Sequence, residues 1–194
     1  MKNQSIRRSR GFTLVELLIV IAIIMVLAAL GFAGVSVAMK RAKTVQSLNL
    51  ATNLAQAITN FVDEYGALPA AAATSAPLNT GSGEGVTLLR VLLAQETGNT
   101  ILNTRGIRFL EPKSANKRKG GIDYGTGGGA VALGMYDAWG EPYYVAFDDD
   151  YNDEITNPNR IGASDQPILR GLKAVVYSAG ADRTIGTKDD VKTW

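Results

Sequence analysis

The sequence contains neither cysteine nor histidine in its 194 residues. The lack of cysteine excludes disulfides, and the two absences together exclude zinc sites of the common type and catalysis by either side chain. Any metal must therefore be bound by oxygen atoms. The glycine run at residues 127–129 is not followed by Lys-Ser or Lys-Thr, so it does not predict a phosphate-binding loop. We therefore expect a protein that is not an enzyme.

Charge is almost absent from residues 12–39, where Glu16 is the single ionisable side chain. About 20 apolar residues are enough for a helix to span a bilayer, so this run predicts a transmembrane helix. Residues 1–11 carry four cations and no acid, and the positive-inside rule places them in the cytoplasm. Residues 40–194 are then expected on the outer side of the membrane.

Excess positive charge is also missing from the body of the chain. The formal net charge is +2, but residues 1–11 hold four of the 20 cations, which leaves 16 against 18 acids, or −2. Phosphate binding needs a concentrated basic face. We expect no nucleic acid partner, and we interpret the basic segment 117–121 as a solvated loop.

Three ordinary interpretations of the amino terminus stay open: a secretory signal peptide, a twin-arginine signal and a single-pass anchor. The apolar run is long for a signal peptide, and no good match surrounds the arginine pair. A plain anchor does not explain Glu16, because an acid at the centre of a membrane helix costs about 2.5–3.5 kcal/mol. Such a residue indicates function by default.

The segment G-F-T-L-V-E at residues 11–16, followed by an unbroken apolar run, closely resembles the class III signal of type IV pilins and type II secretion pseudopilins. The resemblance implies that a prepilin peptidase cuts between Gly11 and Phe12, and that the new amine of Phe12 is methylated. It also implies that Glu16 pairs with the terminal amine of a neighbouring subunit, because an unpaired buried charge is strongly unfavourable.

The apolar run is expected to continue as one helix of roughly 50 residues that ends before Gly66. Many relatives of this class have a proline where this chain has Ala33, between Gly31 and Gly34, so local unwinding is an open question. The large apolar residues of the second half recur at helical spacing and predict one buried face. They are Val45, Leu48, Leu54, Ile58, Phe61 and Tyr65.

The fold expected from the resemblance is α+β and pilin-like, with a long amino-terminal helix against a small antiparallel sheet head. Residues 86–97 predict a short helix with its leucines inward, and residues 107–110, 143–147 and 174–177 predict strands. The segment D-A-W-G-E-P-Y at residues 137–143 resembles the D-x-W-G-x-P-Y segment of major pseudopilins. Its Trp139 is predicted to be a core residue.

The acidic segment 178–191 is the stronger metal candidate, because calcium takes six to eight oxygen ligands on a bent loop. Glycine at position 186 lets the segment curl. It resembles the calcium loop of major pseudopilins, and the resemblance implies side-chain ligation by Asp182, Asp189 and Asp190. The alternative is that these acids only keep a terminal loop soluble.

A second acidic segment, residues 148–155, imitates the start of an EF-hand with Asp148, Asp150 and Asn152 at alternate positions. Asp153 replaces the turn glycine, however, and Asn159 stands where a bidentate glutamate is expected. A solvated turn is therefore favoured over a second calcium site.

The chain is accordingly expected to comprise a leader (1–11), a transmembrane and assembly helix (12–39) and a periplasmic or extracellular head (40–194). The resemblance implies a structural subunit of a type II secretion pseudopilus, a homo-oligomeric filament that drives protein export. The implied partners are the prepilin peptidase, an inner-membrane assembly platform and minor pseudopilins. The alternatives are a type IV pilus subunit for adhesion or motility, and a membrane-tethered binding module.

Overall fold

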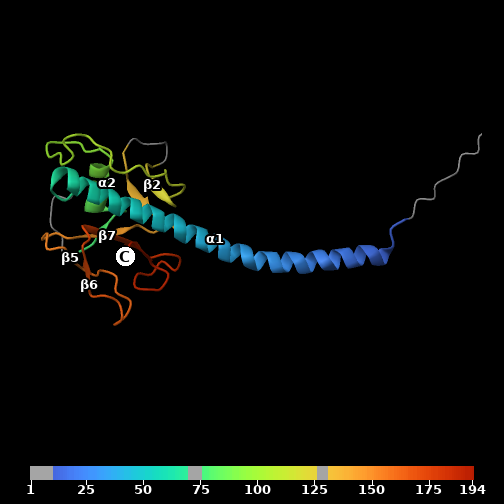
Figure 1. The fold of residues 1–194 in the computed structure, drawn as a ribbon. Coiled ribbons are helices and arrows are strands. Elements are labelled where there is room, and N and C mark those ends of the chain that lie inside the picture. Colours follow the sequence, from blue (N-terminus) through green and yellow to red (C-terminus); the bar gives the residue numbers. More distant parts are fainter. Residues whose placement is uncertain (1–10, 70–75, 126–130) are drawn as a thin grey trace, which may run out of the picture. The chain divides into compact units, whose positions relative to one another are not determined.

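The computed structural model describes residues 11–69, 76–125 and 131–194, and within the first helix the side chains of residues 30–34 lie outside the description. The predicted leader, apart from its last residue, and the glycine run at 127–129 also lie outside it. The chain divides into an amino-terminal unit, Met1–Arg41, and a head, Ala42–Trp194. Figure 1 gives the order of the elements along the chain.

Helix α1, Leu14–Tyr65, has 52 residues and confirms the expected long helix. Its backbone is helical throughout, including residues 31–34, where unwinding was an open question. Gly66 follows at a φ of 67° and its N–H bonds the Val62 carbonyl at 2.7 Å. This left-handed conformation ends the helix at a residue without a Cβ, as helix C-termini commonly do.

In the amino-terminal unit, every described side chain from Phe12 to Ala29 is exposed. Among the described residues, none of the helices contains a stretch both long and apolar enough to cross a membrane. The predicted membrane segment 12–39 includes residues 30–34, whose side chains are not described.

The head adds helix α2, Gly83–Leu92, and short antiparallel strands to the end of α1. The main sheet has the order β1-β4-β7-β8, and the pairs β2–β3 and β5–β6 form two smaller sheets. The strands are β1 (Leu78–Asn79), β2 (Gly121–Asp123), β3 (Gly134–Tyr136), β4 (Tyr144–Phe147), β5 (Glu154–Thr156), β6 (Ile168–Arg170), β7 (Ala174–Ser178) and β8 (Val191–Lys192). The predicted α+β, pilin-like fold is therefore confirmed, as are the strands at 143–147 and 174–177.

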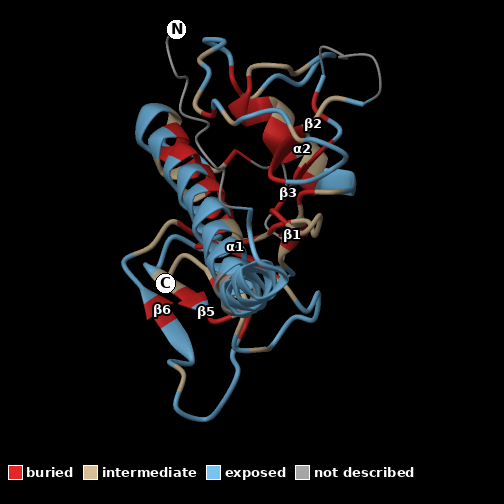
Figure 2. Ribbon diagram, turned by 90° about the vertical axis from the view of Figure 1, so that its right-hand side faces the viewer, coloured by how far each residue is buried: buried red, intermediate tan, exposed pale blue. Residues whose placement is uncertain are grey.

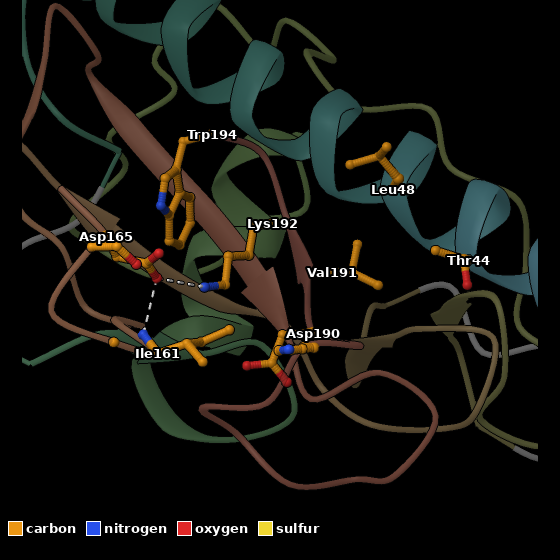
Figure 3. A pocket seen from close by; sticks show the side chains of 11 residues that line it. Thr44, Leu48, Ile161, Asp165, Asp190, Val191, Lys192 and Trp194 are labelled. Atoms are coloured by element: carbon orange, nitrogen blue, oxygen red, sulfur yellow. Dashed lines mark hydrogen bonds and ion pairs between the residues drawn. The ribbon is translucent and has the colours of Figure 1, made fainter.

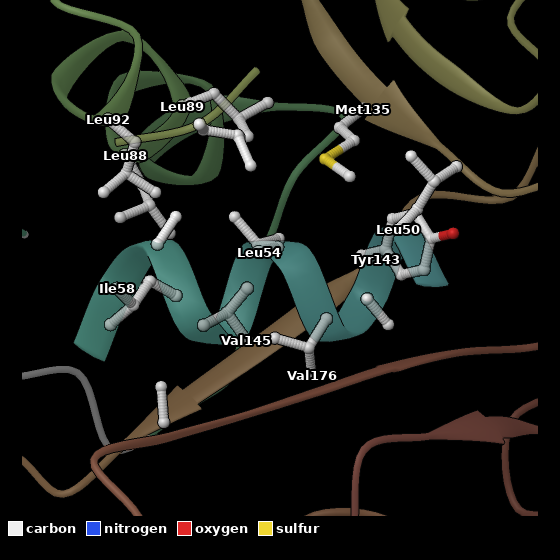
Figure 4. Close-up of a cluster of buried hydrophobic side chains, with 14 of the residues drawn as sticks. Leu50, Leu54, Ile58, Leu88, Leu89, Leu92, Met135, Tyr143, Val145 and Val176 are labelled. Carbon is white, nitrogen blue, oxygen red and sulfur yellow. The ribbon is translucent and has the colours of Figure 1, made fainter. Parts of the chain in front are cut away.

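The core of the head forms where one face of α1 packs against the main sheet and α2. Leu54, Ile58 and Phe61 lie one helical turn apart and are fully buried, which places a single apolar stripe of α1 inward (Figure 2). Figure 4 shows this stripe between Val145 and Val176 of the sheet and the leucines of α2. Leu88, Leu89, Leu92 and Leu93 are all buried, as predicted.

Three details of the sequence prediction were wrong. Val45 and Leu48 were expected inward but are 57% and 38% exposed, because the buried stripe of α1 begins with Ser47 and Leu50. Helix α2 begins at Gly83 and ends at Leu92, not at 86 and 97, because Ala94 turns the chain with a φ of 55°. Residues 107–110 form no strand, since the N–H groups of Phe109 and Leu110 bond the Leu92 carbonyl.

Candidate functional site

The predicted cleavage position lies among exposed residues that precede helix α1. Phe12 is 76% exposed, and among the described residues, apart from the chain neighbours, no heavy atom lies within 4 Å of the position that a Cβ on Gly11 would take. Both residues precede the first helical residue, Leu14. A peptidase can therefore reach the bond between Gly11 and Phe12 without unwinding α1.

Glu16 has a partner within its own chain, which the sequence analysis did not expect. Its carboxylate accepts hydrogen bonds from the Thr13 N–H at 3.1 Å and from the Thr13 hydroxyl at 2.9 Å. The Glu16 N–H in turn lies 3.3 Å from the Thr13 hydroxyl oxygen. This is a reciprocal capping box at the start of α1, and the pattern T-x-x-E is its usual sequence signature. Glu16 thus both caps the helix and carries a charge.

The D-A-W-G-E-P-Y segment is organised by the buried carboxylate of Asp137. One carboxylate oxygen accepts the N–H groups of Trp139, Gly140 and Glu141 at 2.8–2.9 Å. The other accepts the Ser178 hydroxyl of β7 at 2.9 Å. Four donors thus satisfy a charge that is fully buried.

Tyr143 at the end of this segment ties the sheet to α1. Its hydroxyl donates to the Ser47 carbonyl at 2.9 Å, and the Ser47 hydroxyl accepts the Ala138 N–H at 3.0 Å. Burial, with the charge of Asp137 nearby, raises the pKa of Tyr143 far above its ordinary value. Trp139 is only partly buried and packs at the edge of the core, so its predicted core position is confirmed only in part.

The loop before β8 brings Asp189 and Asp190 together. The Thr187 hydroxyl lies 2.9 Å from a carboxylate oxygen of Asp189 and 3.2 Å from one of Asp190. Gly180, at a φ of 64°, lets the chain pass so close to the Asp189 carbonyl that a Cβ would overlap it.

Asp189 is held in its charged form. Partial desolvation raises the pKa of its carboxyl, but hydrogen bonds from the Thr187 hydroxyl and from the Asp182 and Ala181 N–H groups outweigh this effect. The pKa of Asp189 therefore lies below its ordinary value. A lowered pKa keeps the group available as an anion.

The Asp182 carboxylate has a different hydrogen-bond partner from the other two carboxylates. One of its oxygens accepts the Thr184 N–H at 2.8 Å. In the part of the chain that the structure describes, no three acids are gathered around one point that a metal ion could occupy. The calcium site with Asp182, Asp189 and Asp190 therefore stays a prediction.

Asn159 joins this loop from a distant part of the sequence. Its side-chain amide donates to Asp190 at 2.8 Å, and the side chain is 98% buried. Its amide oxygen is a buried polar atom without a hydrogen-bond partner in the described structure. The sequence alone relates Asn159 to the acidic segment at residues 148–155, since no local pattern connects positions 159 and 190.

The second acidic segment closes on itself around Asp148, which is 99% buried. Its carboxylate accepts the N–H groups of Asn152 at 3.0 Å and Asp153 at 3.2 Å, and Lys173 lies 3.7 Å away. The Lys173 ammonium also bonds Asp153 at 2.7 Å, which raises the pKa of the lysine. The Lys173 ammonium thus lies close to the carboxylates of both Asp148 and Asp153. The calcium site at Asp148, Asp150 and Asn152 and the alternative of a solvated turn both stay predictions.

A hollow of about 770 Å³ lies between α1 and the carboxyl-terminal residues. Figure 3 shows the side chains that line it. Leu48 and Trp194 contribute apolar surface, and Asp165 accepts the Ile161 N–H at 3.0 Å beside Lys192.

Comparison with known proteins places a specific motif at the amino terminus. Residues 6–32 match the model of the prokaryotic N-terminal methylation motif, which marks the type IV pilin and pseudopilin class. No curated protein and no solved structure matches the chain. The motif implies processing by a prepilin peptidase, anchoring of a prepilin-like protein at the membrane and assembly into filaments in general.

Proteins of this class are structural subunits, in agreement with the expectation that the chain is not an enzyme. The motif does not distinguish a pilus from a secretion filament. The long α1 that continues into an α+β head agrees with the architecture expected of the class. Residues 6–32 thus carry the N-terminal methylation motif that marks the type IV pilin and pseudopilin class.

Proposed function

We propose that this chain is a structural subunit of a type II secretion pseudopilus, a filament that drives the export of folded proteins. The observation that carries the proposal is the single helix α1, whose side chains up to Ala29 are exposed and apolar apart from Glu16, and which packs into the head from Ser47 onward. Such an exposed apolar surface must be covered by lipid before assembly and by other subunits afterwards.

Two features favour a pseudopilus over a surface pilus. The D-x-W-G-x-P-Y segment, which is similar to that of major pseudopilins, forms a turn built around Asp137 and tied to β7. The chain also lacks the cysteine pair that is common in adhesive pilins. The head would then stand in the periplasm, with α1 in the inner membrane until an assembly platform and minor pseudopilins take up the processed subunit.

The second candidate is a type IV pilus subunit for adhesion or motility, because the motif serves both kinds of filament. Deletion of the gene separates the two. Loss of secretion, with no filaments missing from the cell surface, supports the pseudopilus, whereas loss of long external filaments with normal secretion supports the pilus. If the chain is instead a membrane-tethered binding module, deletion is expected to leave both secretion and external filaments intact.

Processing is tested first, because both filament functions depend on it. Mass spectrometry of the chain extracted from membranes is expected to find Phe12 as the first residue, with a methylated amine. A first residue at any other position would remove the basis for a filament function.

We also propose that the loop before β8 binds calcium through Asp182, Asp189 and Asp190. The supporting observation is the buried, unpartnered amide oxygen of Asn159, which belongs to the same amide group that bonds Asp190. The available donors are carboxylate, amide and main-chain oxygens, the types that calcium prefers. Calcium would stabilise the head in the absence of disulfides, since binding energy adds to folding energy.

The calcium proposal is tested on the full chain in detergent by following the fluorescence of Trp139 and Trp194 during thermal unfolding. Calcium is expected to raise the melting temperature relative to EDTA, and Asp190→Asn is expected to abolish the difference. Asp63→Asn, an exposed acid on α1, serves as the matched control. An unchanged melting temperature between calcium and EDTA would contradict the proposal.

A further inference from the structure

The turn Asn116–Lys119 presents two cations in an unusual backbone conformation. Lys117 and Arg118 have φ values of 51° and 59°, and the main chains of Asn116 and Lys119 bond each other at 3.1 Å in both directions. Positive φ at both central residues is typical of Asn and Gly, and for other residues it costs about 1–3 kcal/mol each. Lysine and arginine at these positions are a structural cost that points to a role for the turn.

The two cations differ in what they contact. Arg118 lies 3.1 Å from the Asp123 carboxylate and 5.7 Å from the centre of the Tyr136 ring, so it fixes the turn to β2 and β3. Lys117 is exposed and makes no hydrogen bond or ion pair with any described residue. The turn therefore holds Lys117 out as an unpaired cation.

The complementary feature is a second hollow, of about 480 Å³, beside β5 and β6. Its lining includes the apolar side chains of Phe147, Ile155 and Ile168 and the ring of Tyr177. Its acidic lining consists of Asp149, Asp150 and Glu154, and neither lysine nor arginine is among its described lining residues.

The three acids of this hollow differ in their hydrogen bonds and ion pairs. Asp150 accepts the Asn152 amide at 2.7 Å, and Glu154 pairs with the exposed Arg170 at 2.9 Å. Asp149 is exposed and has no partner among the described residues. An apolar floor with an unpaired carboxylate fits a lysine, whose methylene groups pack on apolar surface while its ammonium meets the acid.

We propose that Lys117 of one subunit inserts into the hollow at Asp149 of a second copy of this chain. The inference rests on the proposed filament function. Figure 2 shows β2 and β5 toward different ends of the head. The turn precedes β2, whereas all three residues of β5 line the hollow. A contact between two different surfaces repeats from subunit to subunit and builds an open helical array when its rotation does not close a ring.

The absence of native cysteine makes a crosslinking test specific. The full chain with Lys117→Cys and Asp149→Cys is expressed in cells that form the filament and treated with a short bis-maleimide. A ladder of covalent multimers is expected, since each subunit carries both halves of the contact. Each single variant is expected to give no ladder, and the pair Lys117→Cys with Asp63→Cys, another exposed acid, is the matched control.

The outcomes separate the inference from the proposed function. Normal filaments without a ladder would overturn the inference and leave the filament function intact. A crosslink from Asp149→Cys to a different protein would also overturn it. Absence of filaments from the unmodified chain would contradict the proposed function itself.

Charge reversal gives an independent readout. Lys117→Glu and Asp149→Lys are each expected to lower filament yield about tenfold, because like charges then face each other. The double variant is expected to recover most of that yield, with the melting temperature of the head unchanged in all three. A double variant as defective as the single ones would overturn the inference.

Discussion

The hydroxyl of Tyr143 lies 2.9 Å from the main-chain oxygen of Ser47, 96 positions earlier in the chain. This bond joins the end of the D-A-W-G-E-P-Y segment to the first buried turn of α1 within the head. Because Tyr143 is fully buried, its hydroxyl has no water as an alternative partner. The position of this segment on α1 therefore depends on the Tyr143 hydroxyl, on the bond from the Ala138 N–H to the Ser47 hydroxyl and on the apolar contacts around them.

Replacement of this tyrosine is the first prediction. Tyr143→Phe keeps the ring and removes the hydrogen bond, so the head is expected to lose about 1 kcal/mol of unfolding free energy. Tyr151→Phe is the control, because the Tyr151 hydroxyl takes part in an exposed bond at 3.3 Å. Thermal or urea unfolding followed by tryptophan fluorescence measures both. Equal stability of Tyr143→Phe and the unmodified chain would contradict the assigned role.

Asp137 supports the second prediction. Asp137→Ala leaves the N–H groups of Trp139 and Glu141 and the Ser178 hydroxyl without the acceptor that they have inside the head, and a loss of about 3 kcal/mol is expected. Asp137→Asn is expected to cost less, since one amide oxygen can still accept the three N–H groups. Asp63→Ala, at an exposed position of α1, is expected to change stability by under about 0.5 kcal/mol. Comparable losses for Asp137→Ala and Asp63→Ala would refute the assignment.

Alkaline pH gives the third prediction. Burial, with smaller effects of Tyr144 and Asp190, raises the pKa of Tyr177 to about 12, and the pKa of Tyr143 is raised as well. In the unfolded chain tyrosine ionises near pH 10. The stability that these two groups contribute is therefore complete below about pH 10 and is lost as the pH rises toward 12.

The measurement is the unfolding free energy of the full chain in detergent from pH 8 to 12. The double variant Tyr143→Phe/Tyr177→Phe is expected to lose stability less steeply above pH 10 than the unmodified chain. Absorbance near 295 nm reports the late titration of the two groups directly. A steeper loss in the double variant would show that the sign is wrong.

The sequence was sufficient to predict those helices and strands that are determined by residues close together in the chain. The end of α1 before Gly66, the inward leucines of α2 and the strands β4 and β7 follow from spacing, glycine and β-branched content. The reciprocal bonds between Thr13 and Glu16 could also have been predicted, since their spacing is a known capping pattern.

Contacts between distant segments could not be predicted in this way. Asn103, for example, is buried and donates to the carbonyls of Val91 and Ile107 while accepting the Tyr65 hydroxyl. These bonds explain why residues 107–110 cap the end of α2 and do not pair as a strand. The contact between Asn159 and Asp190 has the same character, because only the folded head brings the two loops together.

The last prediction concerns the two roles of Glu16, as a helix cap and as a charge. Glu16→Ala removes both roles, whereas Glu16→Gln keeps the bond to Thr13, because glutamine serves at this position of a capping box. Cleavage between Gly11 and Phe12 is expected to proceed in both variants.

If assembly needs the charge of Glu16, as pairing with the terminal amine of a neighbouring subunit requires, both variants lose filaments. If assembly needs only an intact helix start, Glu16→Gln forms filaments normally and Thr13→Ala is the variant that fails. Filament yield by electron microscopy, with mass spectrometry of the processed chain as the control, separates the two outcomes. We expect the charge to decide, because a capping bond can be replaced by water or by another donor near the helix end, whereas a buried carboxylate without a positive partner cannot be accommodated in the assembled filament.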